Sequence, residues 1–236
     1  MIRCLALFSL LFLSCSPLLK YDTTGDKWEE EIKKLEALDQ KESYSDKAIL
    51  FIGSSSIRLW NSINKDLYPY EPIRRGYGGA HYYDLIHFTE RLVAPHDISA
   101  IAIFVANDIT GKKKTPKRGL RKDLKPKEVL RLAKFITRQI RKSHKSISIF
   151  FIETTPTSSR WNAWPEISTA NDLIKGFTIK KKNMFFIDTR TQYIKSDGLP
   201  NDGFFIKDKL HLNNKGYQLW GKIIRENFNK KLNFKK

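Results

Sequence analysis

The stretch AILFIGSSSIRLW, residues 48–60, decides how the rest of this chain is interpreted. Its first five residues are apolar and end at Gly53, a pattern typical of a short strand buried on both faces. Ser54–Ser56 follow, and the apolar residues after them have the spacing of one helix face. A serine at such a corner is a candidate nucleophile, because helix N–H groups there face any negative charge above the sheet. The same serines could simply cap the helix, so this stretch alone leaves both roles open.

Other apolar runs and amphipathic segments alternate along the chain. Strands are expected at 72–75, 98–105, 147–152 and 184–187, and helices at 28–38, 81–92, 129–140, 165–180 and 216–228. Such alternation predicts an α/β fold in which helices cover both faces of a parallel sheet through right-handed crossovers. No internal repeat and no second core is evident, so one domain is expected.

The N-terminus differs from this domain. Arg3 precedes the apolar run Leu5–Leu13, which has the length of a signal-peptide core and is too short to span a bilayer. Phe-Leu-Ser-Cys at 12–15 resembles the lipobox of bacterial lipoproteins, in which the cysteine is acylated and becomes the mature N-terminus. We expect a lipoprotein signal peptide over 1–15 with lipidation at Cys15, a tether over 16–24 and a domain over 25–236. An exported, lipid-anchored protein of the bacterial cell envelope follows, with an ordinary cleaved signal or an uncleaved anchor as the alternatives.

Composition narrows the possible chemistry and partners. The only two cysteines, Cys4 and Cys15, precede the domain, which excludes disulfides and a cysteine nucleophile from it. The histidines before the final loop show no metal-ligand spacing, so neither a metal nor any other cofactor is expected. The formal net charge of +18 suits an anionic partner. Because export separates the protein from nucleic acid, anionic lipid or acidic glycan is the expected partner.

The segment Lys112–Lys127 concentrates this charge, with nine basic residues and one acid, Asp123. Repulsion at this density predicts a solvated, mobile loop. It follows Asn107, so it is expected to leave the sheet at the edge where the polar residues gather. It would either act as a solubilising surface or draw anionic lipid or polysaccharide to that edge.

Four short polar blocks stand where the predicted strands end or in the final loop: Gly53-Ser54-Ser55, Gly78-Gly79, Asn107-Asp108 and Asp208-Lys209-Leu210-His211. In parallel α/β sheets the site lies beyond the carboxyl ends of the strands, so the blocks are expected to converge. Each one alone has a simpler explanation, as a helix cap, a turn or a glycine in a loop.

In this order, the four blocks resemble those of the SGNH hydrolases, the GDSL esterase family, over about residues 45–225. The resemblance implies a three-layer α/β/α architecture with a flavodoxin-like parallel sheet. It implies Ser55 as nucleophile, Asp208 and His211 as acid and base, and an oxyanion hole made by Ser55, Gly79 and Asn107. The sequence departs from the family's pattern at Ser54, where aspartate is usual, and at Val105, where glycine is frequent.

The chemistry requires the same residue types. A serine hydroxyl needs a base to take its proton, and a carboxylate three residues before His211 can hold the imidazole in one tautomer. The oxyanion of the tetrahedral intermediate needs donors already in place, which two backbone N–H groups and an asparagine amide can supply.

The expected function is a membrane-tethered serine esterase that forms an acyl-enzyme on a small or short-chain ester, of the carbohydrate acetyl ester or lysolipid type. The alternatives are a catalytically silent glycan-binding lipoprotein and an O-acyltransferase. Aromatic residues near the site would serve a glycan-binding module or would simply pack: Tyr77, Tyr82, Tyr83, Trp161 and Trp164. Arg160 is expected either at the surface or paired with an anionic substrate group.

Overall fold

The structure, a computed structural model, describes residues 16–21, 26–111 and 122–232. The expected signal peptide with Cys15 and residues 112–121 of the basic segment lie outside the described residues. The end of that segment differs from the expected loop, because helix α7 begins at Pro126. Proline suits the first turn of a helix, where its missing N–H costs nothing.

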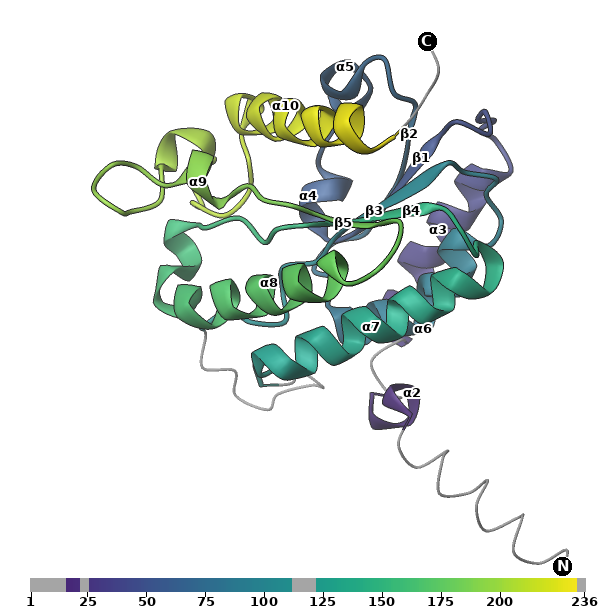
Figure 1. Ribbon diagram of the computed structural model, residues 1–236, viewed down its shortest axis with the longest axis horizontal. Helices are drawn as coiled ribbons and strands as arrows, with labels where there is room; N and C mark the ends of the chain where they lie inside the picture. The colour runs from purple at the N-terminus through teal and green to yellow at the C-terminus, as the bar shows by residue number, and fades with distance from the viewer. Residues whose placement is uncertain (1–15, 22–25, 112–121, 233–236) are drawn as a thin grey trace, which may run out of the picture.

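Five parallel strands form the sheet at the centre of Figure 1, in the order β2-β1-β3-β4-β5. Their bounds are β1 Ile49–Gly53, β2 Pro72–Gly76, β3 Ala100–Phe104, β4 Ser148–Ile152 and β5 Met184–Ile187. This is the flavodoxin-like order, whose topological switch point lies between β1 and β3. The expected fold class is confirmed. Ser55 follows β1 and Asn107 follows β3, so both lie at the switch point.

Helices cover both faces of the sheet (Figure 1). One layer contains α6 Tyr82–Val93, α7 Pro126–Ser143 and α8 Trp164–Ile179, with α3 Glu29–Asp39 and α2 Pro17–Lys20 packed on α6. The other contains α10 Asn214–Lys231 with α4 Ser55–Arg58 and α5 Ile63–Leu67. The remaining helical pieces are η2 Asp26–Trp28, η3 Ser158–Ala163, α9 Arg190–Tyr193 and η4 Asp202–Phe204.

Strand β1 explains why both layers are needed. All of its residues are buried, and they alternate between two hydrophobic cores. Leu50 and Ile52 pack on the α6–α8 side, whereas Ile49 and Phe51 pack on the α10 side. Each such side chain contributes about 1.5–3 kcal/mol when fully buried, so β1 is stable only when both layers are in place.

The N-terminal segment differs from the expected tether. Residues 17–20 form helix α2, and Tyr21 is buried at 2% exposure, stacked on Tyr83 of α6. The Tyr21 carbonyl oxygen lies 2.9 Å from Nε2 of His87, and Lys20 pairs with Glu128 of α7 at 2.6 Å. The sequence did not reveal this docking because a single tyrosine carries no periodic pattern. Among the described residues, no helix is both long enough and apolar enough to cross a membrane.

Candidate active site

Gly53 makes the corner that presents Ser55. Its φ of +131° lies outside the range that other residues adopt easily, and a Cβ there would lie 1.9 Å from the carbonyl oxygen of Phe104. The close approach lets the Ser54 N–H donate to that same oxygen at 2.9 Å. The chain then turns directly into α4, whose first residue is Ser55. Helix α4 is shorter than the expected helix and has a single turn.

Ser55, His211 and Asp208 form a connected triad. Oγ of Ser55 lies 3.0 Å from Nε2 of His211, and Nδ1 of His211 lies 2.6 Å from a carboxylate oxygen of Asp208. Both distances are within hydrogen-bond reach. A histidine whose Nδ1–H donates to a carboxylate has Nε2 unprotonated and ready to accept a proton. The structure therefore brings together residues that are 156 positions apart in the chain.

One short loop fixes the acid and the base. It is closed by an isolated antiparallel bridge between Phe205 and Leu212. Inside the loop, the backbone N–H groups of Leu210 and His211 donate to Asp208 at 2.9 and 3.0 Å. Burial raises the pKa of Asp208, but the hydrogen bonds from the His211 ring and these two N–H groups outweigh it, and the net pKa lies below the ordinary value. Asp208 is therefore held as a carboxylate.

Two of the three expected oxyanion donors are backbone N–H groups. That of Ser55 lies at the start of α4. Gly79 has φ of +72°, and a Cβ there would lie 3.3 Å from the Trp28 indole. The conformation therefore favours glycine, and any larger residue would also push against the Trp28 ring.

Asn107 is the third expected donor, and hydrogen bonds hold both the oxygen and the nitrogen of its side-chain amide. Nδ2 donates to the carbonyl oxygen of Ala80 at 2.8 Å, and Oδ1 accepts from Arg160 at 2.6 Å. A primary amide has two N–H donors, so one remains for an oxyanion after the bond to Ala80. The neighbouring Asp108 has a structural role, because its carboxylate accepts from the Tyr82 N–H at the start of α6 at 2.9 Å.

Arg160 is the site residue whose placement the sequence did not predict. Its side chain is buried at 8% exposure, in the same pocket as Ser55, Asn107 and His211. The expectation of a surface arginine is wrong, because the loop after β4 folds inward at η3 and carries Arg160 beneath Asn107. The sequence did offer one signal: Arg160 follows β4 and Asn107 follows β3, and loops after neighbouring parallel strands lie side by side. Burial lowers the pKa of Arg160 to about 10, so it remains protonated at neutral pH.

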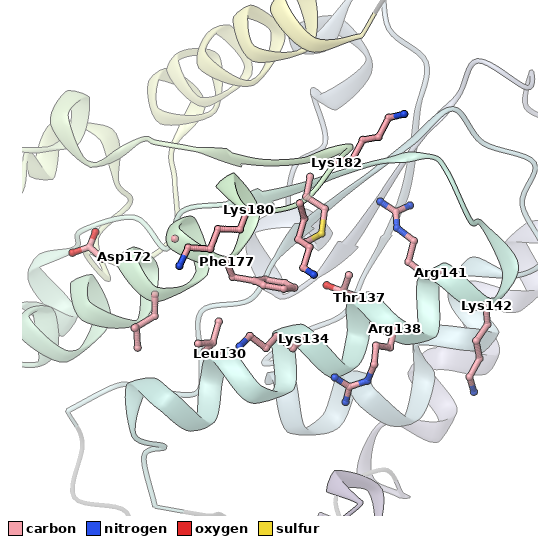
Figure 2. Close-up of a pocket in the computed structure, with 14 residues that line it drawn as sticks. Leu130, Lys134, Thr137, Arg138, Arg141, Lys142, Asp172, Phe177, Lys180 and Lys182 are labelled. Atoms are coloured by element: carbon pink, nitrogen blue, oxygen red, sulfur yellow. The ribbon is translucent and has the colours of Figure 1, made fainter.

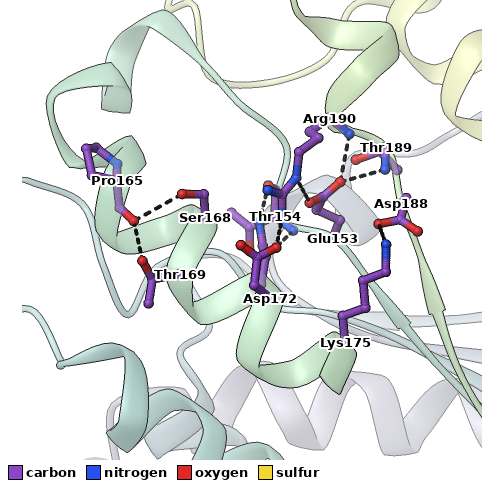
Figure 3. A network of polar contacts seen from close by, with 11 residues as sticks. Glu153, Thr154, Pro165, Ser168, Thr169, Asp172, Lys175, Asp188, Thr189 and Arg190 are labelled. Atoms are coloured by element: carbon purple, nitrogen blue, oxygen red, sulfur yellow. Dashed lines mark hydrogen bonds and ion pairs between the residues drawn. The ribbon is translucent and has the colours of Figure 1, made fainter. Parts of the chain in front are cut away.

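A buried network fixes the end of β4, from which the Arg160 loop starts (Figure 3). The carboxylate of Glu153, which is fully buried, accepts from the backbone N–H groups of Thr189 and Arg190 at 2.7 Å each and pairs with the Arg190 side chain. Asn171 of α8 exchanges hydrogen bonds with the Thr154 backbone, both at 3.1 Å. Because every contact of Glu153 is structural, this acid is not a candidate base.

Three of the five aromatic residues near the site are packing residues. Tyr77, Tyr82 and Tyr83 are at most 4% exposed. Trp161 and Trp164 are partly exposed and stack on each other with ring centroids 5.8 Å apart. The aromatic surface open to a glycan is therefore smaller than the sequence indicated.

The cavity beside Ser55 is small and has both polar and apolar walls. Its volume is about 20 Å³, and it is lined by residues from all of the strand-end loops except the one after β2: Ser54, Ser55, Ser56, Phe104, Ala106, Asn107, Thr154, Thr155, Thr157, Arg160, Phe205, Leu210, His211 and Leu212. Such a volume holds about one water molecule or a group of similar size. Within residues 16–21, 26–111 and 122–232, no cluster of three or more His, Cys, Asp or Glu could hold a metal ion.

Comparison with known proteins agrees with this geometry at the level of the fold. No family model matches the chain, and no curated protein matches it in sequence. Several solved structures resemble this chain over almost the whole of their own length. The chain has the SGNH hydrolase fold.

Three of these structures indicate the range of the similarity. A candidate platelet activating factor from Streptococcus pneumonia has a TM-score of 0.71 and 18% identity, with 89% of this chain and 97% of that chain covered. A GDSL-like lipase from Bacteroides thetaiotaomicron has a TM-score of 0.67 and 15% identity, with 85% and 98% covered. A carbohydrate esterase family 3 protein from Talaromyces cellulolyticus has a TM-score of 0.58 and 15% identity, with 78% and 97% covered.

Proposed function

We propose that this chain is a serine esterase that hydrolyses a short-chain ester, of the carbohydrate acetyl ester type, through an acyl-enzyme on Ser55. The observation that carries the proposal is the unbroken series of contacts from Ser55 Oγ to His211 Nε2 at 3.0 Å and from His211 Nδ1 to Asp208 at 2.6 Å. Similar folds in a lipase and a carbohydrate esterase support ester hydrolysis as the reaction class.

Acylation begins when Ser55 Oγ attacks the ester carbonyl carbon and its proton passes to His211 Nε2. The carbonyl oxygen becomes an oxyanion that accepts from the Ser55 N–H, the Gly79 N–H and the Asn107 amide. The intermediate then collapses, and the alcohol leaves with the proton from His211. Asp208 stabilises the imidazolium that exists between these two transfers, and its lowered pKa keeps it charged for this task.

Deacylation repeats the sequence with water. His211 takes a proton from a water molecule, and the resulting hydroxide equivalent attacks the acyl-enzyme carbonyl carbon. Collapse of the second intermediate returns the proton to Ser55 and releases the carboxylic acid. Each cycle therefore consumes one ester and one water and needs no cofactor.

The size of the cavity supports a short acyl group. The cavity of about 20 Å³ that Ser55 lines admits a methyl group beside the carbonyl but not a long chain, whereas the groove of about 680 Å³ on the other side of His211 has room for the alcohol part of the ester. A lysolipid with its acyl chain in this cavity would need the walls to move apart. We therefore favour an acetyl ester over a lysolipid.

We also propose that the enzyme is exported and held at a bacterial membrane through a lipid on Cys15. The support is the apolar run before the Leu-Ser-Cys motif at 13–15. Cys15→Ser should prevent incorporation of radiolabelled palmitate in cells and should release the protein from the membrane fraction.

The first experiment measures hydrolysis of p-nitrophenyl esters from acetate to palmitate by the purified protein. We expect the highest kcat/KM with acetate and a steep fall with longer chains. Ser55→Ala should abolish turnover. Ser146→Ala should leave it unchanged, because Ser146 precedes β4 and lies at the amino ends of the strands, away from the site. A rate maximum at long chains would overturn the preference for short acyl groups.

A fluorophosphonate probe separates the esterase from a silent glycan-binding module, because only an activated serine reacts with it. Labelling that is lost in Ser55→Ala supports the esterase, and absence of labelling in the wild-type protein contradicts it. Product analysis with an added sugar acceptor then distinguishes hydrolysis from acyl transfer.

A further inference from the structure

Arg160 is a buried cation that the mechanism above does not use. Its guanidinium contacts two oxygens of the segment after β3, donating to the carbonyl oxygen of Ala106 and, at 2.6 Å, to Oδ1 of Asn107. Burial lowers the pKa of Arg160 to about 10 and outweighs Asp123 and Asp108, which lie near enough to favour its charged form. Burying a guanidinium whose direct hydrogen-bond partners are neutral oxygens is costly, so the contact with Asn107 should have a function of its own.

The contact with Asn107 determines which way the amide faces. With Oδ1 towards Arg160, Nδ2 donates one N–H to Ala80 at 2.8 Å and keeps its second N–H for an acceptor in the pocket that Asn107 lines. If the amide were rotated by half a turn, Nδ2 would meet the guanidinium and Oδ1 would meet the Ala80 carbonyl. Both contacts would then be repulsive, so the positive charge of Arg160 selects the orientation that serves an oxyanion.

The charge also strengthens the donor. A cation that binds the amide oxygen polarises the amide, and hydrogen bonds in series reinforce one another where the dielectric constant is low. The guanidinium therefore adds positive potential at the position where negative charge develops, without touching the substrate.

We propose that Arg160 is a positioning residue that acts through Asn107: it fixes and polarises the amide so that Asn107 completes the oxyanion hole. This inference rests on the proposed function, since it assigns Arg160 a part in the same reaction. The competing explanation is that Arg160 only holds the loop after β4 in place.

The test is a double-mutant cycle on the full chain, with p-nitrophenyl acetate as substrate. Arg160→Met should lower kcat by roughly 10- to 100-fold and change KM by less than about threefold, because loss of one oxyanion donor costs roughly 10²–10³ in rate. Asn107→Ala should cost as much or more. In the Asn107→Ala background, Arg160→Met should have little further effect, because residues that act through one another are not additive.

A purely structural role predicts a different result. Arg160→Met would then lower the melting temperature and would reduce kcat by the same factor with or without Asn107, which would overturn the proposal. Arg160→Lys keeps the cation and its stem but cannot donate to both oxygens as a planar fork, so its kcat should lie between those of wild type and Arg160→Met. If Arg160→Met does not fold, the same cycle with Arg160→Lys decides the question.

Failure of this inference differs from failure of the proposed function. If the wild-type protein hydrolyses the ester in a Ser55-dependent manner and Arg160→Met retains full kcat, only the role of Arg160 is wrong. If the wild-type protein neither hydrolyses the ester nor reacts with the fluorophosphonate, the esterase itself is wrong.

Discussion

The pocket beside Ser55 and the groove between helices α7 and α8 are opposite in size and in chemistry. The pocket has a volume of about 20 Å³, whereas the groove has about 980 Å³. Figure 2 shows the groove, which is lined by Leu130, Lys134, Thr137, Arg138, Arg141, Lys142, Asp172, Leu173, Gly176, Phe177, Lys180, Lys181, Lys182 and Met184. It contains neither a histidine nor a serine, and its cations lie on helix α7 and in the turn that follows helix α8.

The difference shows that size alone does not locate chemistry in this molecule. The groove lies between α7 and α8, where Leu130 and Phe177 pack on the core and the long cationic side chains of α7 surround them. Arg141, at one end of the groove, donates hydrogen bonds to the backbone carbonyl oxygens of His144, Ile147 and Asn183, so its role is structural. The small pocket is formed instead by loops from the ends of neighbouring strands, where nucleophile, base and donors can be brought within hydrogen-bond distance.

The largest effect expected is loss of the base. His211→Gln should reduce kcat/KM for p-nitrophenyl acetate by a factor of roughly 10⁴–10⁶, because Ser55 then has no group to take its proton. Near-ultraviolet circular dichroism should remain that of the wild type. A variant that kept more than a tenth of the wild-type activity would mean that the pocket beside Ser55 does not differ from the groove by holding a catalytic base.

Glycine substitutions sharpen the comparison through stability. Gly53→Ala should destabilise the protein by about 3 kcal/mol or more, since its Cβ would lie 1.9 Å from a backbone oxygen at a φ of +131°. Gly176 in the groove is the matched control, because a Cβ there has no neighbour within 4 Å. Gly176→Ala should stabilise helix α8 by roughly 0.5–1 kcal/mol. Urea unfolding of the two variants measures both changes, and equal effects would contradict this account of the corner.

A smaller effect concerns pH and Asp208. Its pKa is lower in the folded protein than its ordinary value of 3.8, so the stability it contributes is present above that value and is lost as the pH falls through the lowered pKa. Asp208→Asn should therefore reduce the free energy of unfolding at pH 7, by no more than about 1 kcal/mol because the carboxylate is partly exposed. The difference from wild type should narrow below pH 4. A difference that stays constant down to pH 2 would show that the charge of Asp208 is not responsible.

The smallest effect is expected in the groove. Replacement of Lys180, Lys181 and Lys182 by serine should leave kcat/KM for p-nitrophenyl acetate within about twofold of wild type, because solvated charges this far from the site are screened at physiological salt. The ratio of the kcat/KM values of this triple variant and of the wild type should be the same at low and high ionic strength. A tenfold loss of activity would mean that the groove is coupled to catalysis.

Much of the fold and the triad could be predicted from the sequence because both depend on local patterns. Fully buried parallel strands appear as continuous apolar runs, and Met184–Ile187 was located to the residue. The polar blocks after the strands are equally visible, and the structure brings together Ser55, Asp208 and His211 as expected.

Features that depend on tertiary packing could not be predicted. Arginine is usually found at the surface, and nothing in the sequence around Arg160 indicates otherwise. The irregular backbone of η3, with φ of −125° at Arg160, places its side chain in the interior. Helices α5 and α9 are too short to show a helical period. Tyr21 is buried because α6 offers Tyr83 as a partner, which the residues around Tyr21 do not reveal.

The docking of Tyr21 on α6 limits how far the lipid proposed at Cys15 would lie from the folded domain. Nine extended residues from 16 to 24 would have formed a flexible tether of roughly 30 Å between the domain and a membrane. The chain is instead held to the domain from Pro17 to Tyr21, near the end of α6 that follows Gly79. Consecutive α-carbons are about 3.8 Å apart, so a lipid on Cys15 would be attached almost directly to the folded body. Under the proposed anchoring, the esterase would act on esters in the layer next to the lipid headgroups rather than on polymers at a distance, and lengthening the chain before Ser16 would extend its reach.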